Sequence, residues 1–457
     1  MHSRTNKKDH SASILTSEQS TPMHRPIAEK QLDNTCLCVS QEASKTNIQD
    51  QLDILVLSNG HGEDLVARRI TAAILKSNKN ITVGALPLVG IGSTYERLLL
   101  KTARLIILNP RQIMPSAGFC AKNMRWLWAD IRSGLIQLLV AQFRAIRQLV
   151  RRNHCLTIAV GDSLPLALAW LSGGSYVYVQ LKKSDHMWMH NKKRLSYWWY
   201  SLVGTNWNPL EIALAKSKRC VLRFTRDVES SRNLARIGII AYPANPMMDN
   251  MNVRLRNPSK GLGSNIICLP GSRSRETISN FQSILNIIKL LIRDADRPLT
   301  FLVPMATDDM QKRVNHMLLS ASLKNTVLQS EYTGNISSDH QRHQIICGKD
   351  MLRPWSEIAS VGIAMAGTAT EQVAGVGIPC VTIAGEGPQF CLGFAKRQHR
   401  LLGKCAQLAK NYQHAAKLVL ELLNDNKIAM DYGQIGVKRM NSRGGSQKVA
   451  TKVLSIL

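Results

Sequence analysis

The sequence predicts an α/β protein with two Rossmann-like domains, and three stretches of the chain support that prediction. In residues 361–384, an apolar run is followed by a glycine turn, a short helix-like segment, a Gly-Ile-Pro break and a second apolar run. That order is typical of a strand–turn–helix–strand unit in a parallel sheet. The stretches 53–89 and 266–304 have the same order, with a glycine-containing turn between an apolar run and a helix-like segment.

The turn Gly367–Glu371 is the first candidate binding element. A helix that begins directly after a strand presents free backbone N–H groups, which suit a phosphate. The plain alternative is a capping box, because Glu371 lies three residues after Thr368. The turn therefore needs a second motif to support a binding role.

The second motif is the turn Pro270–Arg273, which lies between a four-residue apolar run and the helix-like segment Glu276–Arg293. Gly271 permits a tight turn, Ser272 can cap the helix and Arg273 can pair with a phosphate. The alternative is an ordinary strand-to-helix turn with a solvated arginine. If both turns end strands of one sheet, we expect them to face the same crevice.

Both turns resemble a known family, through Leu269-Pro270-Gly271-Ser272-Arg273 with Glu276 and through Gly367-Thr368-Ala369-Thr370-Glu371. They look like the donor-domain motifs of lipid-A-disaccharide synthases, GT-B-fold glycosyltransferases that use a UDP-acylglucosamine donor. The resemblance implies two Rossmann-like domains facing across a cleft. It also implies a set of nucleotide-binding residues: Gly271, Ser272, Arg273, Gly367, Thr368, Ala369, Thr370 and Glu371.

The resemblance covers residues 52–457 and is strongest in the C-terminal half. Residues 58–64 and 114–119 are more similar to the divergent "lipid-A-disaccharide synthase-related" branch of cyanobacteria and plastid-bearing organisms, which need not share the acceptor. We expect residues 51–249 to form an N-terminal Rossmann-like acceptor domain, 250–265 a linker and 266–457 a C-terminal Rossmann-like nucleotide-sugar domain. The resemblance implies that the last helix crosses back to the N-terminal domain.

Residues 1–50 are expected to be a disordered extension, because they are polar and lack hydrophobic periodicity. They contain no apolar segment of a secretory signal, and their six acidic residues disfavour a transit peptide.

The first glycine-rich turn, Ser58–Asp64, follows the expected strand 53–57 and contains catalytic candidates. It lacks the GxGxxG pattern, so a dinucleotide fingerprint is not supported. Gly60 and Gly62 would let the backbone approach a ligand. His61, Glu63 and Asp64 are candidate bases, and the alternative for the two acids is a first helical turn favoured by the helix dipole.

Asp162 is the main candidate for a general base. It follows the apolar run Leu156–Val160 and precedes a helix-like segment, a position where cleft residues lie in Rossmann-like domains. The alternative is an N-cap aspartate. The resembling family has Val-Gly-x-Asp here, and its aspartate is thought to be the general base. In this chain the spacing is one residue shorter, and the family's second acidic residue is missing.

The net charge of +28 and a pI near 10.0 indicate anionic partners, since residues 1–50 contain six basic and six acidic residues and contribute none of the excess. A genome-wide basic bias is the alternative. Residues 124–152 and 182–200 mix aromatic side chains with Lys and Arg, as interfacial surfaces do. We expect contacts to a lipid acceptor or an anionic membrane surface from Trp126, Trp128, Trp188, Lys192, Lys193 and Arg194. Base stacking is possible chemistry for such aromatics, but no RNA-binding motif accompanies them.

Ten scattered cysteines, with Cys36-x-Cys38 as the only close pair, predict a reducing, cytosolic compartment and neither a structural metal nor a cofactor. No run reaches about 18 apolar residues, so we expect a protein peripheral on the inner face of the membrane. The expected function is metal-free transfer of an acylated glucosamine-like sugar from UDP to a lipid-like acceptor. The alternatives are a UDP-N-acetylglucosamine 2-epimerase-like enzyme of the same fold and a non-catalytic membrane- or RNA-binding protein.

Overall fold

The computed structural model describes residues 51–113, 124–188, 195–251, 264–272, 274–321, 326–329, 342–385, 387, 390–440 and 443–457. All of the described elements belong to one unit, Thr46–Leu457. The expected extension 1–50 and most of the expected linker lie outside the described residues, as do Arg273, Lys192, Lys193 and Arg194.

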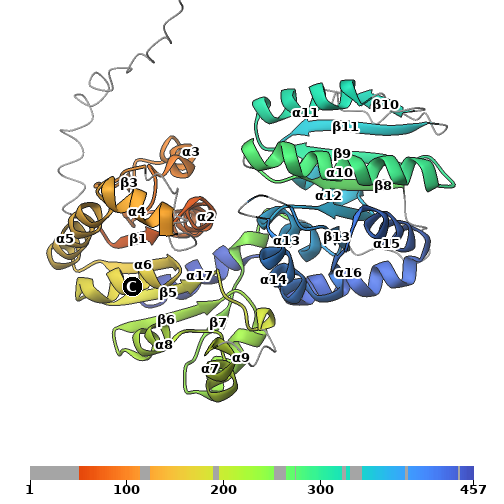
Figure 1. Cartoon of the computed structure of the whole chain (residues 1–457). Helices are drawn as coiled ribbons and strands as arrows, with labels where there is room; N and C mark the ends of the chain where they lie inside the picture. The colour runs from red at the N-terminus through yellow and green to blue at the C-terminus, as the bar shows by residue number, and fades with distance from the viewer. Residues whose placement is uncertain are drawn as a thin grey trace, which may run out of the picture. The chain divides into compact units, whose positions relative to one another are not determined.

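The N-terminal domain contains a sheet of seven parallel strands in the order β3-β2-β1-β4-β5-β6-β7 (Figure 1). The strands are β1 (Ile54–Ser58), β2 (Val83–Pro87), β3 (Leu105–Ile107), β4 (Leu156–Gly161), β5 (Tyr176–Gln180), β6 (Cys220–Thr225) and β7 (Tyr242–Pro243). The order reverses between β1 and β4, which is where ligands bind in open α/β sheets.

Helices cover both faces of this sheet, because alternate strand residues point to opposite faces. In β1, Ile54 and Val56 contact one hydrophobic cluster, whereas Leu55 and Leu57 contact another. The helical segments are α2 (His61–Ser77), η1 (Ser93–Tyr95), α3 (Glu96–Leu99), α4 (Met124–Arg132), α5 (Leu135–Asn153), α6 (Ser163–Ser172), η3 (Asp185–Met187), α7 (Leu195–Val203), α8 (Pro209–Lys216), α9 (Val228–Arg236) and η4 (Pro246–Met248).

The aromatic and basic segment 124–152 forms two helices, α4 and α5. Gly134 lies between them with a φ of 92°, a left-handed conformation that favours glycine. The buried residues of α5 recur every four positions and pack on the sheet, as an amphipathic helix does. They are Leu138, Gln142, Ile146 and Val150.

The C-terminal domain contains a second parallel sheet of seven strands, in the order β10-β11-β9-β8-β12-β13-β14. The strands are β8 (Asn265–Leu269), β9 (Thr300–Met305), β10 (Thr326–Gln329), β11 (His343–Lys349), β12 (Val361–Ala364), β13 (Cys380–Thr382) and β14 (Ala406–Leu408). The α/β architecture with two Rossmann-like domains is therefore confirmed. Here the strand order reverses between β8 and β12.

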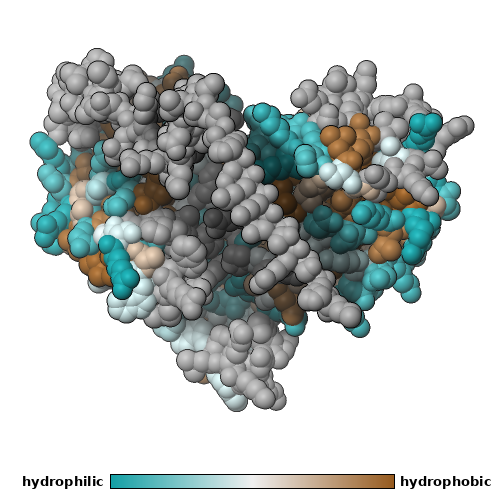
Figure 2. Space-filling model, turned by 45° about the horizontal axis from the view of Figure 1, so that its top comes forward, coloured by the Kyte–Doolittle hydropathy of each residue, from teal (hydrophilic) through white to brown (hydrophobic). Residues whose placement is uncertain are grey.

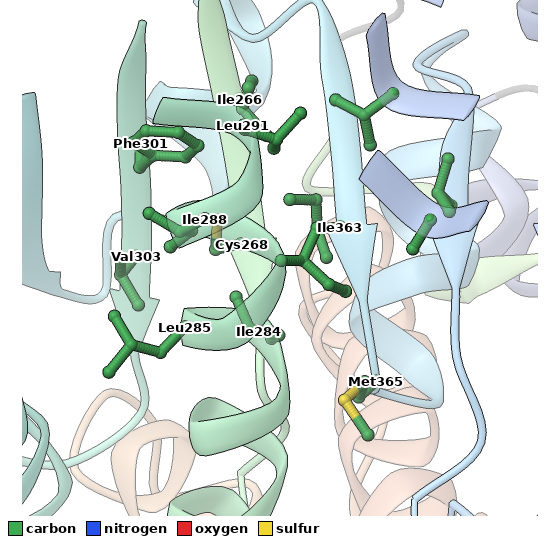
Figure 3. Close-up of a cluster of buried hydrophobic side chains, with 14 of the residues drawn as sticks. Ile266, Cys268, Ile284, Leu285, Ile288, Leu291, Phe301, Val303, Ile363 and Met365 are labelled. Atoms are coloured by element: carbon green, nitrogen blue, oxygen red, sulfur yellow. The ribbon is translucent and has the colours of Figure 1, made fainter. Parts of the chain in front are cut away.

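The helical segments of this domain are α10 (Ser274–Asp294), α11 (Asp308–Ser320), α12 (Leu352–Ile358), α13 (Thr368–Gly375), α14 (Leu392–Leu402), η5 (Gly403–Cys405), α15 (Tyr412–Asn424), α16 (Asn426–Met440) and α17 (Gly445–Leu454). Figure 3 shows how α10 packs its apolar stripe onto β8, β9 and β12. Burying one such side chain contributes about 1.5–3 kcal/mol to stability. The labelled residues are Ile284, Leu285, Ile288 and Leu291 of α10, with Ile266, Cys268, Phe301, Val303, Ile363 and Met365.

The last helix, α17, packs against α2 of the N-terminal domain. Its buried Val449, Ala450 and Val453 belong to the same hydrophobic cluster as β1 and α2. The Asp249 carboxylate accepts hydrogen bonds from the backbone N–H groups of Gly444, Gly445 and Ser446 at 3.0, 2.7 and 2.9 Å. Those contacts satisfy the amides at the start of α17.

Candidate active site

Four polar side chains meet at the carboxyl edge of the N-terminal sheet, where the strand order reverses. Asn59 and Asp162 follow the adjacent strands β1 and β4, Lys182 follows β5, and Glu63 lies in the first turn of α2. The Lys182 Nζ lies 2.8 Å from Asp162 Oδ2 and 3.0 Å from Glu63 Oε1. The Asn59 amide donates to Asp162 Oδ1 at 2.9 Å. We call these four residues the Asp162 cluster.

Glycine at position 161 makes this arrangement possible. Gly161 has a φ of 127°, and a Cβ added there would lie 3.1 Å from Glu63 Cγ. A larger residue would therefore be strained and would press against Glu63. The close approach of α2 to the end of β4 depends on this position.

Asp162 is both an N-cap and a member of the cluster. Its Oδ1 accepts a hydrogen bond from the Leu164 N–H at 3.2 Å, which caps α6. Burial opposes its ionisation, but the Lys182 ammonium and the hydrogen bonds from Lys182, Leu164 and Asn59 outweigh burial and hold the pKa of Asp162 below its ordinary value. An aspartate stabilised in this way is ionised at neutral pH and is a weak base while Lys182 stays in contact with it.

Lys182 supplies the positive charge of the cluster. Burial lowers the pKa of its ammonium, but the nearby carboxylates of Glu63 and Asp162 outweigh burial and raise that pKa above its ordinary value. His61 begins α2, and its side chain lies outside the described part of the chain. Of the four catalytic candidates, the structure thus brings Asp162 and Glu63 together through Lys182.

Asp64, the remaining acid of the first turn, points into the core. The Ser58 hydroxyl donates to its Oδ1 at 2.5 Å, and the Tyr95 hydroxyl lies 3.1 Å from Ser58 Oγ. Burial raises the pKa of Asp64 to about 7, against the opposing effect of the Ser58 hydrogen bond. Because Asp64 is only 4% exposed, its carboxyl is poorly placed to contact a substrate directly.

The two glycine turns (residues 270–272 and 365–368) lie side by side at the point of reversal in the C-terminal sheet, after β8 and β12. Gly271 has a φ of 103°, which favours glycine. The Asn280 amide of α10 joins the turns, because it donates to the Pro270 carbonyl at 3.0 Å and the Met365 carbonyl at 3.3 Å. Gln398 of α14 donates to the Ala366 and Gly367 carbonyls at 3.1 and 3.0 Å.

The N-terminus of α13 has no capping box. Its N-cap is Gly367, which provides no side-chain cap, so the capping interpretation of Thr368 and Glu371 is wrong. Thr370 is buried, and its hydroxyl donates to the Ala366 carbonyl at 2.6 Å, so it supports the turn instead of presenting a hydroxyl to a ligand. Thr368 is exposed. The first N–H groups of α13 and the helix dipole together make a site suited to an anion.

Glu371 forms a buried ion pair with Arg226. The Arg226 Nη2 lies 2.8 Å from Glu371 Oε2, and the two side chains are 4% and 11% exposed. Arg226 follows β6 and also donates to the Leu181 carbonyl at 3.1 Å. Arg226 therefore connects Leu181, the residue before Lys182, to α13, the helix that begins at the second glycine turn.

Sequence reasoning missed the roles of Lys182 and Arg226. Both residues follow strands of the N-terminal sheet at its carboxyl edge, since β5 ends at Gln180 and β6 at Thr225. That position is the signal that could have identified them. No local motif marks either residue.

The predicted acceptor residues whose side chains the structure describes are Trp128 and Trp188. Trp128 of α4 is 57% exposed. Ile136 and Val140 of α5, which follow it in the sequence, are 57% and 43% exposed. Trp188 is partly buried and stacks on Tyr200 with ring centroids 4.3 Å apart. The side chain of Trp126 lies outside the described residues. Figure 2 shows hydrophobic side chains in small groups among hydrophilic ones on the visible face.

Within the described ranges, no three His, Cys, Asp or Glu side chains gather into a metal-binding group. None of the helices there is long and apolar enough to cross a lipid bilayer.

No family model and no curated protein matches this sequence. Solved structures match along most of the chain. The chain is similar to a UDP-GlcNAc 2-epimerase from Neisseria meningitidis bound to UDP-GlcNAc, with 12% identity, a TM-score of 0.50 and coverage of 88% of this chain and 100% of that one. It is similar to S. aureus MnaA in a structure with UDP, with 13% identity, a TM-score of 0.51 and coverage of 88% and 97%.

A third similar structure is a UDP-glucosyltransferase from Polygonum tinctorium capable of glucosylating indoxyl, in a complex with 3,4-dichloroaniline. The identity is 11%, the TM-score is 0.53, and the match covers 89% of this chain and 98% of that one. The fold is GT-B. At these identities the likeness establishes the fold alone, and it agrees with the two parallel sheets.

Proposed function

We propose that this protein is a glycosyltransferase that moves an acylated glucosamine-like sugar from UDP to a lipid-like acceptor, as the resemblance to lipid-A-disaccharide synthases implies. The observation that carries the proposal is the pair of polar sites at the two points of strand reversal. One is the Asp162 cluster, and the other is the pair of glycine turns beside the uncapped N-terminus of α13.

The donor would bind with its diphosphate at the start of α13. Backbone N–H groups and the helix dipole stabilise phosphate charge there without a metal. Gly271 lets the neighbouring turn come close to the ligand, and Arg273 would pair with a phosphate oxygen. Glu371 would accept ribose hydroxyls through Oε1, because Arg226 contacts Oε2.

Transfer requires the acceptor hydroxyl to lose its proton as its oxygen attacks C1 of the sugar. The new C1–O bond forms while the bond from C1 to the UDP oxygen breaks, and UDP leaves with the electron pair. We propose that Asp162 takes the proton when the acceptor hydroxyl replaces Lys182 at Oδ2. Loss of the ammonium contact would raise the basicity of that carboxylate.

The test is an assay with a radiolabelled UDP-sugar and a lipid extract of the source organism. The proposal predicts label in the organic phase together with release of UDP. Label that stays in the aqueous phase, without release of UDP, would contradict it. Comparing the lipids of cells with and without the protein by mass spectrometry would then identify the product.

A second candidate is a UDP-N-acetylglucosamine 2-epimerase-like enzyme, which the epimerase among the similar structures favours. Such an enzyme removes the proton at C2, so a reaction in D₂O would place deuterium on that carbon. A glycosyltransferase leaves C2 untouched. Mass spectrometry of recovered UDP-GlcNAc distinguishes the two activities. A protein that does neither and does not bind UDP would be a non-catalytic membrane- or RNA-binding protein.

We propose that the reaction with a lipid-like acceptor takes place at the cytoplasmic face of a membrane. The exposed Trp128, Ile136 and Val140 support a peripheral contact there. Four of the exposed residues that follow on α5 are basic, namely Arg144, Arg147, Arg151 and Arg152. An apolar surface bordered by arginines suits the interface of an anionic bilayer.

A further inference from the structure

A cavity of about 500 Å³ lies between the segment after β5 and the helices α14 and α16. It contains no residue of the Asp162 cluster or of the two glycine turns. Most of its lining is basic, and none of the described residues that line it is acidic. We call it the basic pocket, and its polar and aromatic members are His186, Trp188, His399, Arg400, Lys404 and Arg439.

Backbone carbonyls hold the two arginines of the basic pocket in place. The Arg400 Nε donates to the Met187 carbonyl at 3.0 Å, which connects α14 to η3. The Arg439 Nη1 donates to the Leu401 carbonyl at 3.1 Å. Gly403, with a φ of 61°, makes room for Arg439, because a Cβ there would lie 2.9 Å from the guanidinium carbon. The guanidinium groups are therefore positioned before any ligand arrives.

Carboxylates outside the described lining act on two side chains of the basic pocket, His186 and Arg439. Burial and the Arg439 charge lower the pKa of His186, although Asp227 and Glu229 oppose them, so this histidine is neutral at pH 7. Burial also lowers the pKa of Arg439, against the effect of Asp227. Asp227 is not among the described residues that line the pocket, and its Oδ1 caps α9 by accepting from the Ser230 N–H at 2.8 Å. Arg400, Lys404 and Arg439 thus give the pocket three cationic side chains, and its lining among the described residues contains no carboxylate.

We propose that the basic pocket binds a phosphate monoester. Arginine and lysine donors suit phosphate oxygens, and Arg400, Lys404 and Arg439 all line this pocket. Trp188 and Ile435 would contact the organic part of the ligand. The phosphate belongs to a lipid headgroup or to a soluble ester. This site is separate from the proposed UDP site and does not depend on it.

A ligand in the basic pocket would connect two parts of the molecule. His186 and Trp188 belong to the segment that begins at Lys182, whereas Arg400, Lys404 and Arg439 belong to the C-terminal domain. A phosphate that contacts both sides would hold this segment against α14. We therefore expect occupancy of the pocket to influence the position of Lys182 in the Asp162 cluster.

The test is a calorimetric titration of the full chain with glycerol 1-phosphate in the presence of saturating UDP. Lys404→Gln should weaken binding about tenfold, the loss expected for one charge-assisted contact. Lys438→Gln is the matched control, because Lys438 is an exposed lysine of α16 outside the lining. It should leave the affinity unchanged. Equal effects of the two substitutions would overturn the proposal.

Vesicles distinguish the two sources of phosphate. Phosphatidylcholine vesicles that contain phosphatidic acid should bind the native protein better than Lys404→Gln if the ligand is a headgroup. Binding of glycerol 1-phosphate without such a vesicle effect supports a soluble ester. If neither probe binds in a manner sensitive to Lys404, the proposal is wrong. If UDP alone abolishes the binding of glycerol 1-phosphate in both variants, the phosphate occupies the glycine turns and the proposal is also wrong.

Discussion

The buried ion pair between Arg226 and Glu371 allows a quantitative prediction about stability. Arg226→Leu would remove the guanidinium that lies 2.8 Å from the Glu371 carboxylate and leave that carboxylate, which is 11% exposed, without its partner. Breaking a buried ion pair in this way lowers the free energy of unfolding by about 3–5 kcal/mol. The double variant Arg226→Leu/Glu371→Leu leaves no buried charge, so it should be less destabilised than Arg226→Leu alone.

Urea unfolding of the native protein, the two single variants and the double variant gives the coupling energy between the side chains. The exposed pair Arg313–Asp309 of α11, at 3.0 Å, is the control, and its coupling should be below about 1 kcal/mol. If the single costs at Arg226 and Glu371 simply add in the double variant, the pair does not stabilise the protein and the reasoning is refuted.

The same pair changes what is expected of Glu371→Gln. From the sequence, this variant should weaken UDP binding and leave stability nearly unchanged. The contact with Arg226 adds a stability cost, because a neutral amide replaces the partner of a buried guanidinium. We expect this cost to be smaller than that of Arg226→Leu, since the amide oxygen still accepts a hydrogen bond from Nη2.

Three further predictions concern turnover, pH and membranes. Asp162→Asn keeps the α6 cap but removes the base, so turnover should fall about 10²–10⁴-fold with UDP affinity intact. If Asp162→Asn keeps near-normal turnover while His61→Ala or Glu63→Gln loses it, the base lies in the first turn. Burial raises the pKa of Asp64 from 3.8 to about 7, so the folded state holds this proton and stability should fall as pH rises through that window. Urea unfolding at pH 5 and pH 8 should show a smaller fall for Asp64→Asn than for the native protein. In flotation assays the protein should bind anionic vesicles in a salt-sensitive way, and equal binding to neutral vesicles would contradict the electrostatic part of the idea.

The sequence was sufficient for the strands and turns that have strong local patterns. Buried parallel strands are continuous apolar runs, which is why β1, β4 and β8 could be recognised. The turn at Gly271 could be placed because a glycine directly follows such a run. The short strands β10 and β14 were not recognised, because four and three residues carry too little pattern.

The contacts within the candidate site were beyond the reach of local patterns. Asp162 and Lys182 are 20 residues apart in sequence, and Arg226 and Glu371 are 145 apart. Such pairs form only when the strand order brings distant turns to one edge of a sheet. The same reason explains why a capping box at Thr368 and Glu371 stayed open as an alternative, since the sequence could not show Arg226 beside Glu371.

The central claim is that the two glycine turns bind a UDP-sugar, and a calorimetric titration of the full chain with UDP tests it most directly. We predict one UDP per chain, a weaker affinity in Glu371→Gln and an unchanged affinity in Asp162→Asn. Enzymes typically bind substrates with constants between about 1 μM and 1 mM. A native protein that shows no binding heat at about 1 mM UDP would contradict the claim.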